Sequence, residues 1–438
     1  MAHMTTCIRW RNCRFLVAVL VVLGVWLPVR AEHRTAALHL AWESIRQDEI
    51  KQHVEYLADE RLEGREAGTR GGQAAGDYLI GQLARLGLRP AGSDGAYSQP
   101  FGSNFRNILA LMDGNDPERH EELVAVGAHY DHIGYGTGGN SKGPAGYIHP
   151  GADDNASGVA GLLELAEAAT FFAKPPRRAI LFAFWDAEEK GMLGSRHWLA
   201  HPTLPRRNVV FYLNLDMIGR LRSNRLVVLG TRSSYGLRLL CSRHNPDAEL
   251  DLHFTWKMAP EADYFPFFER GIPVLALFTG LHDEYHRPSD RPELVDAAGI
   301  RRITRLALGV LDELANADSP PAFREASRQE NEAVRKQLAE TQPVLPAQPL
   351  RVGIVWRRDD AEPHSVEITA VVPQSPAHKA GLKPGDRIVE VEGLAPPGDD
   401  ALADKLRTLP GPIRLRIERQ GRLRTIEIQV SQRVKQAA

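Results

Sequence analysis

The stretch Leu123-Val124-Ala125-Val126-Gly127-Ala128-His129-Tyr130-Asp131-His132 passes directly from an apolar run into a cluster of polar side chains. A continuous apolar run of about six residues is typical of a strand buried on both faces, because a half-exposed strand would alternate. Three further runs have the same form: Ala179–Trp185 precedes Glu188 and Glu189, Val209–Leu215 precedes Asp216, and Val274–Phe278 precedes His286. This pattern predicts an α/β fold with a mixed, largely parallel central sheet flanked by helices.

The polar residues that follow these runs are expected to meet in one crevice. In open α/β sheets, ligand-binding side chains gather beyond the carboxyl ends of the strands. The residues at those ends are His129, Glu188, Glu189, Asp216 and His286. Five groups of metal-ligand type are therefore directed at one place.

Imidazole and carboxylate groups together suit zinc or a similar divalent ion. Two such ions about 4 Å apart need a carboxylate that reaches both. Asp153, which opens a helix after Gly151, is the expected bridge. Taken alone, Asp153 or Asn155 could simply cap that helix. The five ligand-type residues in combination favour a two-metal hydrolase site.

The adjacent carboxylates Glu188 and Glu189 are expected to have different roles, because neighbouring residues at a strand end point in different directions. One can bind a metal ion while the other takes a proton from the attacking water. The residues by themselves leave open which glutamate does which.

Several stretches resemble the zinc-dependent aminopeptidases, a family that includes the bacterial leucyl aminopeptidases and, more distantly, glutamate carboxypeptidase. The resemblance spans about residues 40–315 and keeps the family's order. The stretches that carry it are Gly127-Ala128-His129-Tyr130-Asp131, Pro150-Gly151-Ala152-Asp153-Asp154-Asn155-Ala156-Ser157-Gly158, Asp186-Ala187-Glu188-Glu189, Leu215-Asp216-Met217 and His286-Arg287-Pro288-Ser289-Asp290.

The resemblance implies a role for each matching residue. His129 and Asp216 would bind one zinc ion, Glu189 and His286 the other, and Asp153 would bridge the two. Glu188 would be the general base, and Asp131 would orient the His129 ring, as carboxylates beside ligating histidines commonly do. The family also has a cis peptide bond at the position between Asp153 and Asp154.

The resemblance leaves the group that stabilises the oxyanion unassigned. Some family members place a tyrosine shortly before the last metal ligand, and here the corresponding stretch is Ala259–Phe267. Tyr264 and His282 are the candidates, although a packed aromatic is the more ordinary role for Tyr264.

Helices are expected at 45–57, 72–86 and from Asp296 to about Ala317. The segment 61–70 is interpreted as a surface loop that could edge the cleft. The segment 133–149 is rich in glycine and lies between two ligand motifs, which favours a loop at the rim of the cleft.

The first 31 residues read as a secretory signal. Three arginines, Arg9, Arg11 and Arg14, precede the apolar stretch 15–27, and cleavage is expected after Ala31. We therefore expect a secreted or periplasmic protein with no membrane span after cleavage, an uncleaved anchor being the alternative. Only Cys241 would remain, which excludes an intramolecular disulfide.

The composition sets further limits on partners. The chain has 438 residues, 43% of them hydrophobic, and a formal net charge of −1. Its Lys and Arg residues form no basic cluster with interleaved aromatics, so nucleic acid is not an expected partner.

A second domain is expected at the C-terminal end. Residues 32–317 form the predicted catalytic domain, 318–347 a helical and proline-rich linker, and 348–432 a small β-rich domain. The segment 375–388, which begins Ser375-Pro376-Ala377 and ends Asp386-Arg387-Ile388, resembles the hallmark of a PDZ domain. PDZ domains bind a chain terminus or extended peptide as an added strand, so a C-terminal peptide or protein ligand is a candidate partner.

The leading prediction is an exported dinuclear zinc aminopeptidase that releases N-terminal residues from peptides. A dipeptidase or carboxypeptidase of the same architecture is the alternative among enzymes, and a glutaminyl cyclase is a weaker one. In a different class, the chain could be a catalytically silent protein that binds peptides through its PDZ domain.

Overall fold

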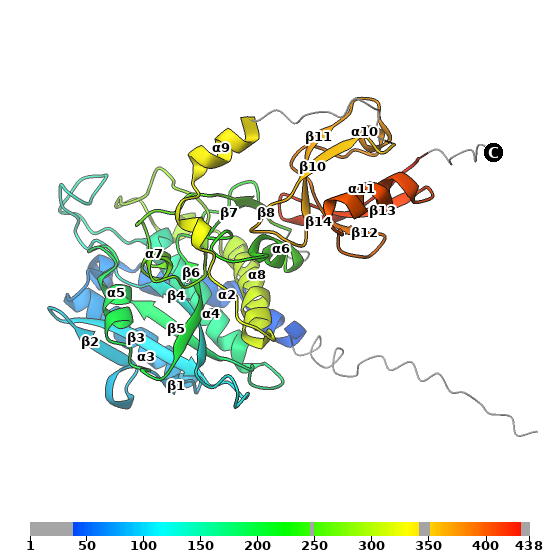
Figure 1. Cartoon of the computed structure of the whole chain (residues 1–438). Helices are drawn as coiled ribbons and strands as arrows, with labels where there is room; N and C mark the ends of the chain where they lie inside the picture. Colours follow the sequence, from blue (N-terminus) through cyan, green and yellow to red (C-terminus); the bar gives the residue numbers. More distant parts are fainter. Residues whose placement is uncertain (1–37, 246–248, 341–350, 431–438) are drawn as a thin grey trace, which may run out of the picture.

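The computed structural model describes residues 38–245, 249–340 and 351–430. The expected signal segment, residues 1–31, and residues 341–347 of the expected linker lie outside the described residues. Two sheets form the centres of two domains, a large N-terminal domain and a small C-terminal domain of residues 351–430 (Figure 1). No helix in the described ranges is long and apolar enough to cross a membrane.

The large domain is built on a nine-stranded sheet with the order β1-β3-β5-β4-β6-β9-β7-β8, and β2 pairs with β3. Its centre is parallel, because β4 pairs in parallel with β5 and β6, and β6 with β9. The strands are β1 Arg89–Pro90, β2 Ser98–Phe101, β3 Phe105–Met112, β4 Glu122–His129, β5 Ala179–Trp185, β6 Asn208–Leu215, β7 Arg225–Leu229, β8 Asp251–Phe254 and β9 Val274–Phe278. The predicted mixed, largely parallel sheet is confirmed.

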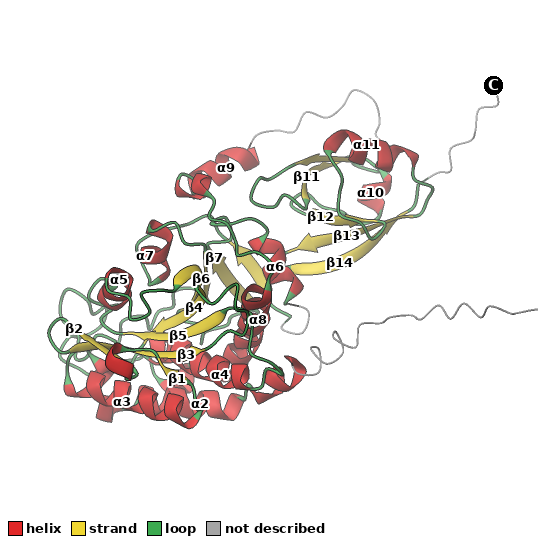
Figure 2. Cartoon of the chain, turned by 60° about the horizontal axis from the view of Figure 1, so that its bottom comes forward, coloured by secondary structure: helices red, strands yellow, loops and turns green. Residues whose placement is uncertain are grey.

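Helices cover both faces of this sheet, which explains the continuous apolar runs. Val124 and Val126 of β4 pack with α2, α3, α4 and α8 on one face, while Leu123 and Ala125 pack with Trp198 of α5 and Phe267 of α7 on the other (Figure 2). The helices are α2 Gln47–Leu57, α3 Arg70–Arg85, α4 Gly158–Thr170, α5 Leu193–Ala200, α6 Leu237–Arg243, α7 Tyr264–Glu269, α8 Ala297–Asn316 and α9 Glu332–Glu340.

The helices α2, α3 and α8 lie where the periodicity predicted them, and two of them begin at a capping side chain. Thr69 accepts a hydrogen bond from the Gly72 N–H at the start of α3, and Asp296 accepts one from the Gly299 N–H at the start of α8. Such caps satisfy N–H groups that have no partner inside the helix.

The C-terminal domain is a five-stranded antiparallel sheet in sequence order, with two short helices. Its apolar residues form a separate core. The elements are β10 Ile354–Arg357, β11 Val366–Val371, α10 Pro376–Lys379, β12 Arg387–Val391, α11 Asp399–Thr408, β13 Ile413–Arg419 and β14 Arg422–Ile428. The predicted β-rich character is confirmed.

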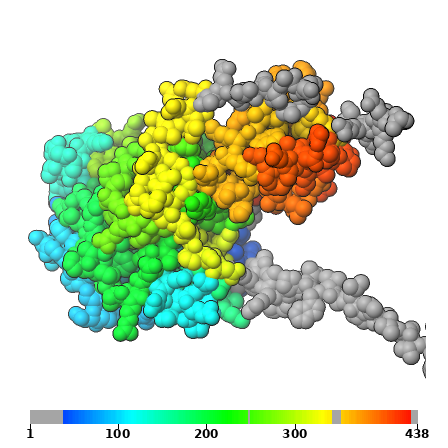
Figure 3. Space-filling model, viewed as in Figure 1, coloured from blue at the N-terminus to red at the C-terminus, as the bar shows by residue number. Residues whose placement is uncertain are grey.

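The C-terminal domain is attached to the edge of the large sheet through the turn between β13 and β14. The Leu252 N–H on edge strand β8 donates to the Gln420 carbonyl at 3.0 Å. Arg238 of α6 pairs with the buried Glu418 at 2.7 Å, and Arg232 pairs with Asp359 at 2.9 Å. The space-filling view shows the two domains in contact (Figure 3). An edge strand that would otherwise be open is thereby covered.

Candidate metal centre

The candidate site lies beyond the carboxyl ends of the central parallel strands. Strands β4, β5 and β6 end at His129, Trp185 and Leu215. Because these strands are parallel and adjacent, the residues that end or follow them meet at one edge of the sheet. This brings His129, Glu188, Glu189 and Asp216 together with Asp154 and His286 from two connecting loops.

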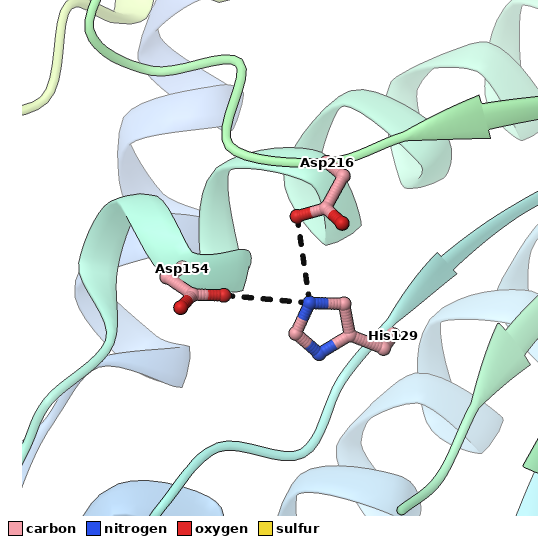
Figure 4. A group of neighbouring side chains, drawn as sticks. All are labelled: His129, Asp154 and Asp216. Carbon is pink, nitrogen blue, oxygen red and sulfur yellow. Dashed lines mark ion pairs between the residues drawn. The ribbon is translucent and has the colours of Figure 1, made fainter. Parts of the chain in front are cut away.

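The first group of candidate ligands is formed by His129, Asp154 and Asp216 (Figure 4). The His129 Nε2 atom lies 3.4 Å from Asp154 Oδ1 and 3.5 Å from Asp216 Oδ1. His129 and Asp154 are buried, and Asp216 is partly exposed. Three donor atoms of zinc-binding type therefore face a common point.

The second group shares Asp154 with the first. His286 Nε2 lies 3.1 Å from Asp154 Oδ2 and 3.3 Å from Glu189 Oε2. The other oxygen of Glu189 lies 2.9 Å from His132 Nδ1, and His132, Asp154 and Glu189 also form a possible ligand group. The two oxygens of Asp154 thus belong to different groups, which is the arrangement that a bridging carboxylate requires.

The charges of these side chains favour cations in the site. Burial opposes ionisation of Asp154, but hydrogen bonds from His129 and His286 hold the pKa of this carboxyl well below its usual range. Burial and the nearby Asp154 also oppose ionisation of Glu189, yet hydrogen bonds from His132 and His286 lower its pKa to about 2. A site that stabilises carboxylates by placing imidazoles beside them suits divalent ions, which replace the imidazole protons when they bind. The residues therefore fit the predicted metal centre.

The prediction that Asp153 is the bridge is contradicted by the geometry. Asp153 Oδ1 accepts a hydrogen bond from the Gly219 N–H at 2.6 Å, and its Oδ2 lies 3.0 Å from His282 Nε2. The next residue, Asp154, has non-helical backbone angles (φ −103°, ψ 95°), so the two carboxylates point to different places. The two oxygens of Asp154, by contrast, face His129 and His286. The cis peptide bond, expected between Asp153 and Asp154, is instead Asp154–Asn155.

Asp131 lies beside His129, but its carboxylate has a second set of partners. The His129 Nδ1 atom is 3.2 Å from the Asp131 carbonyl oxygen and 3.7 Å from the carboxylate. The carboxylate accepts hydrogen bonds from the N–H groups of Glu188 and Glu189 at 3.0 and 3.4 Å. Asp131 therefore links the loop after β4 to the loop that carries the paired glutamates.

Glu188 differs in its surroundings from Glu189. Both glutamates are partly exposed, but burial together with the negative charges of Asp263 and Glu189 raises the pKa of Glu188 well above the usual range, although His129 opposes the shift. A carboxylate that holds a proton more readily than its neighbour is suited to proton transfer.

The two candidates for the oxyanion group are both engaged elsewhere. Tyr264 is buried, and its hydroxyl donates to the Ala259 carbonyl at 2.8 Å. His282 contacts Asp153 through Nε2 and Glu284 through Nδ1. Tyr264 is thus a packed aromatic with a satisfied hydroxyl.

The glycine-rich segment 133–149 lies against the site, as its position in the sequence suggested. The Asn140 carbonyl lies 2.7 Å from His286 Nδ1, and the Lys142 N–H donates to the His286 carbonyl at 2.9 Å. The Lys142 ammonium also lies over the Tyr285 ring, 4.7 Å from its centroid. This loop fixes the orientation of one candidate metal ligand.

Two further residues at the site, His132 and Asp290, were not assigned a role from the sequence. His132 stands three residues after His129, and a second histidine beside a candidate ligand is itself a signal in the sequence. Asp290 is buried and accepts hydrogen bonds from the N–H groups of Asp153 and Asp154 at 2.9 and 3.1 Å. It holds the loop that carries the bridging carboxylate, a role that depends on contacts between distant segments.

Comparisons with known proteins give matches for both domains. Residues 107–311 match the sequence profile described as Peptidase family M28, and residues 367–419 match that of a PDZ domain. Leucine aminopeptidase 2 of Trichophyton equinum is 32% identical over 186 residues, which are 40% of this chain and 33% of that protein. Leupeptin-inactivating enzyme 1 of Streptomyces exfoliatus is 27% identical over 235 residues, 53% of this chain and 49% of that protein. The chain thus spans about a third to a half of these relatives.

Solved structures share the fold of the large domain. The LapA aminopeptidase of Legionella pneumophila matches with a TM-score of 0.53 at 18% identity, covering 66% of this chain and 75% of that one. The zinc aminopeptidase BSAP of Bacillus subtilis matches with a TM-score of 0.50 at 16% identity, covering 64% of this chain and 98% of that one.

The fold and the group of candidate ligands agree with the matches to a peptidase family and to a PDZ domain. The large domain contains a Peptidase family M28 domain at residues 107–311, and the C-terminal domain contains a PDZ domain at residues 367–419.

Proposed function

We propose that this protein is an exported dinuclear zinc aminopeptidase. The observation that carries the proposal is the position of Asp154, whose two oxygens face His129 on one side and His286 on the other. His129, Asp154 and Asp216 would hold one ion, and Asp154, Glu189 and His286 the other. His132, which contacts Glu189, would steady that ligand.

When bound, two zinc ions would supply Lewis acidity that polarises the scissile carbonyl and makes water a better nucleophile. The chain's own residues would move the proton. Glu188 would accept it from the attacking water and deliver it to the leaving amine, since its partly exposed carboxylate holds a proton more readily than Glu189 does. Asp131 would keep Glu188 in place through the main-chain N–H that it binds.

Substrate choice separates this proposal from a dipeptidase or carboxypeptidase of the same fold. We expect aminoacyl anilides and peptides with a free α-amine to be cleaved, and N-blocked peptides to resist. A panel of aminoacyl anilides, N-acetylated peptides and dipeptides, assayed on the zinc-loaded full chain, measures this. Cleavage confined to N-blocked peptides would contradict the aminopeptidase assignment, and no cleavage of any substrate by the zinc-loaded chain would favour the catalytically silent alternative.

The export proposal rests on the charge and apolar pattern of residues 1–31. Cys241, the one cysteine among the described residues, is buried and free. Mass determination of the mature protein purified from its natural host is expected to give an N-terminus at Glu32. An N-terminus within the first few residues would contradict cleavage after Ala31.

The PDZ domain is proposed to bind a free peptide C-terminus. In the described part of the chain β10 is an end strand of its sheet, while β14 at the opposite edge follows the turn that contacts the large domain. Gly353, just before β10, has a φ of +86°, and a Cβ there would lie 2.2 Å from Ser375, so this loop requires glycine. The β10 edge is therefore the side on which a peptide strand could be added.

A peptide library displayed with free C-termini, screened on the full chain carrying Glu188→Gln, would supply ligands that the enzyme does not degrade. We expect the best of these peptides to bind at least about tenfold more weakly when its C-terminus is amidated, because the carboxylate hydrogen bonds are lost. Equal affinity of the two forms, measured by fluorescence anisotropy, would contradict recognition of a C-terminus.

A further inference from the structure

Arg65 is a fully buried arginine whose side chain binds only main-chain carbonyl groups. Its Nε donates to the Tyr130 carbonyl at 2.9 Å, Nη1 to the Leu57 and Pro150 carbonyls at 2.6 Å each, and Nη2 to the Gly151 carbonyl at 3.0 Å. The segment 61–70, predicted to be a surface loop, is therefore partly interior. A guanidinium carries five donors in a fixed plane, which suits it to hold several acceptors at once.

Three of the four carbonyls that Arg65 binds belong to the two loops that carry candidate metal ligands, and the fourth, Leu57, ends α2. Tyr130 stands directly after His129 and two residues before His132, while Pro150 and Gly151 precede Asp154 by a few residues. One side chain thus joins the loop after β4 to the loop that holds the bridging carboxylate. Within the described structure, it links both candidate ligand groups through their backbones.

The backbone around Arg65 also makes hydrogen bonds with the loop after β4. The His132 N–H donates to the Arg65 carbonyl at 3.2 Å, and the Gly134 N–H donates to the Gly64 carbonyl at 3.1 Å. A Cβ at position 64 would lie 2.5 Å from the His149 carbonyl oxygen, so the two segments approach as closely as glycine allows.

Three consecutive residues here have left-handed backbone angles: Glu63 (φ 51°), Gly64 (φ 68°) and Arg65 (φ 48°). Non-glycine residues rarely adopt this conformation, and it persists only where surrounding contacts impose it. The strained turn aims the Arg65 side chain inward, toward the two loops.

The charge of Arg65 is retained although the side chain is buried. Burial lowers its pKa to about 10, while the negative charges of Asp154, Asp131, Asp290 and Glu189 act in the opposite direction. The guanidinium is therefore protonated at neutral pH. Within the described residues its side-chain hydrogen bonds go to carbonyl oxygens, so it leaves the carboxylates of the site available for metal ions.

We propose that Arg65 is a positioning residue that fixes the distance between the His129 loop and the Asp154 loop, and thereby the retention of metal ions in the site. The inference rests on the proposed metal centre. It assigns Arg65 no contact with substrate. A positive charge at position 65 is not enough for this positioning role. A lysine ammonium presents its donors from a single nitrogen and cannot reach four carbonyls in a plane.

The test compares Arg65→Lys with Arg178→Lys in the full chain. Arg178 is a matched control: it is equally buried and binds the Leu314 and Ala317 carbonyls and Glu122, all outside the metal site. Each protein is loaded with zinc, and the rate of zinc transfer to a chromogenic chelator is measured together with the melting temperature of the metal-free form. We expect Arg65→Lys to release zinc at least tenfold faster than the wild type, and Arg178→Lys to release it within twofold of the wild-type rate, with both variants melting lower when metal-free.

A second variant, Arg65→Gly, is measured with and without millimolar guanidinium, which can occupy the vacated cavity. Slower zinc release on adding guanidinium, in this variant and not in Arg178→Gly, is the expected result. Equal rates of release for the two lysine variants would overturn the proposal, and so would failure of both Arg65 variants to fold, because Arg65 would then serve the whole fold. If the wild type retained no zinc, the proposed metal centre itself would fail, and that outcome is distinct from the others.

Discussion

Replacing Asp154 with asparagine is expected to remove both zinc ions and to lower kcat/KM by at least about a thousandfold, or about 4 kcal/mol of transition-state stabilisation. Each oxygen of this carboxylate faces a different ligand group, with His129 Nε2 at 3.4 Å on one side and His286 Nε2 at 3.1 Å on the other. An amide has one weakly donating oxygen and no negative charge, so neither ion keeps its shared ligand. Zinc content after dialysis, measured by elemental analysis, checks the prediction.

Asp153→Asn is the matched control for this change. Asp153 is buried, and its oxygens contact the Gly219 N–H and His282 instead of the two groups of candidate ligands. We expect the variant to keep two ions and to lose about 1–3 kcal/mol of unfolding free energy, the cost of disturbing a buried hydrogen-bonded carboxylate. Loss of both ions from Asp153→Asn, with retention in Asp154→Asn, would restore Asp153 as the bridge.

Glu188→Gln is expected to keep both ions and lose turnover, by about 3 kcal/mol or more of transition-state stabilisation. Glutamine fills nearly the same space and preserves the main-chain N–H that Asp131 binds, so the loop should remain in place. What it lacks is the ability to accept a proton. The kcat/KM on an aminoacyl anilide, together with the zinc content, provides the measurement.

Substitution of the neighbouring residue, Glu189→Gln, should lower the zinc affinity, which Glu188→Gln is expected to leave unchanged. Glu189 contacts both His132 and His286, so its loss is expected to weaken one metal site while the other ion stays bound. A zinc titration would then show one tight and one weakened site. If Glu188→Gln lost zinc and Glu189→Gln kept it, the assignment of base and ligand would be reversed.

The strands that lead to the site could be predicted because a strand buried on both faces is apolar along its whole length. The runs 123–128 and 179–185 are apolar at every position, and both lie in strands covered by helices on two faces. The polar residues after them could then be placed at one edge of the sheet. Which of Asp153 and Asp154 faces the candidate ligands could not be predicted, since the two side chains are chemically identical and only the backbone angles of their turn separate them.

The amino-acid sequence by itself determined which residue types follow which strands, and that a PDZ domain follows the large domain. It also determined that His129, Glu189, Asp216 and His286 lie close together. These features depend on neighbours within a few residues. Only the tertiary structure decided that Asp154 is the shared carboxylate, that Asp131 holds the backbone of Glu188, and that the charged side chain of Arg65 lies inside the molecule. These features depend on hydrogen bonds between segments far apart in the chain, and the pattern of a single segment does not encode its distant partners.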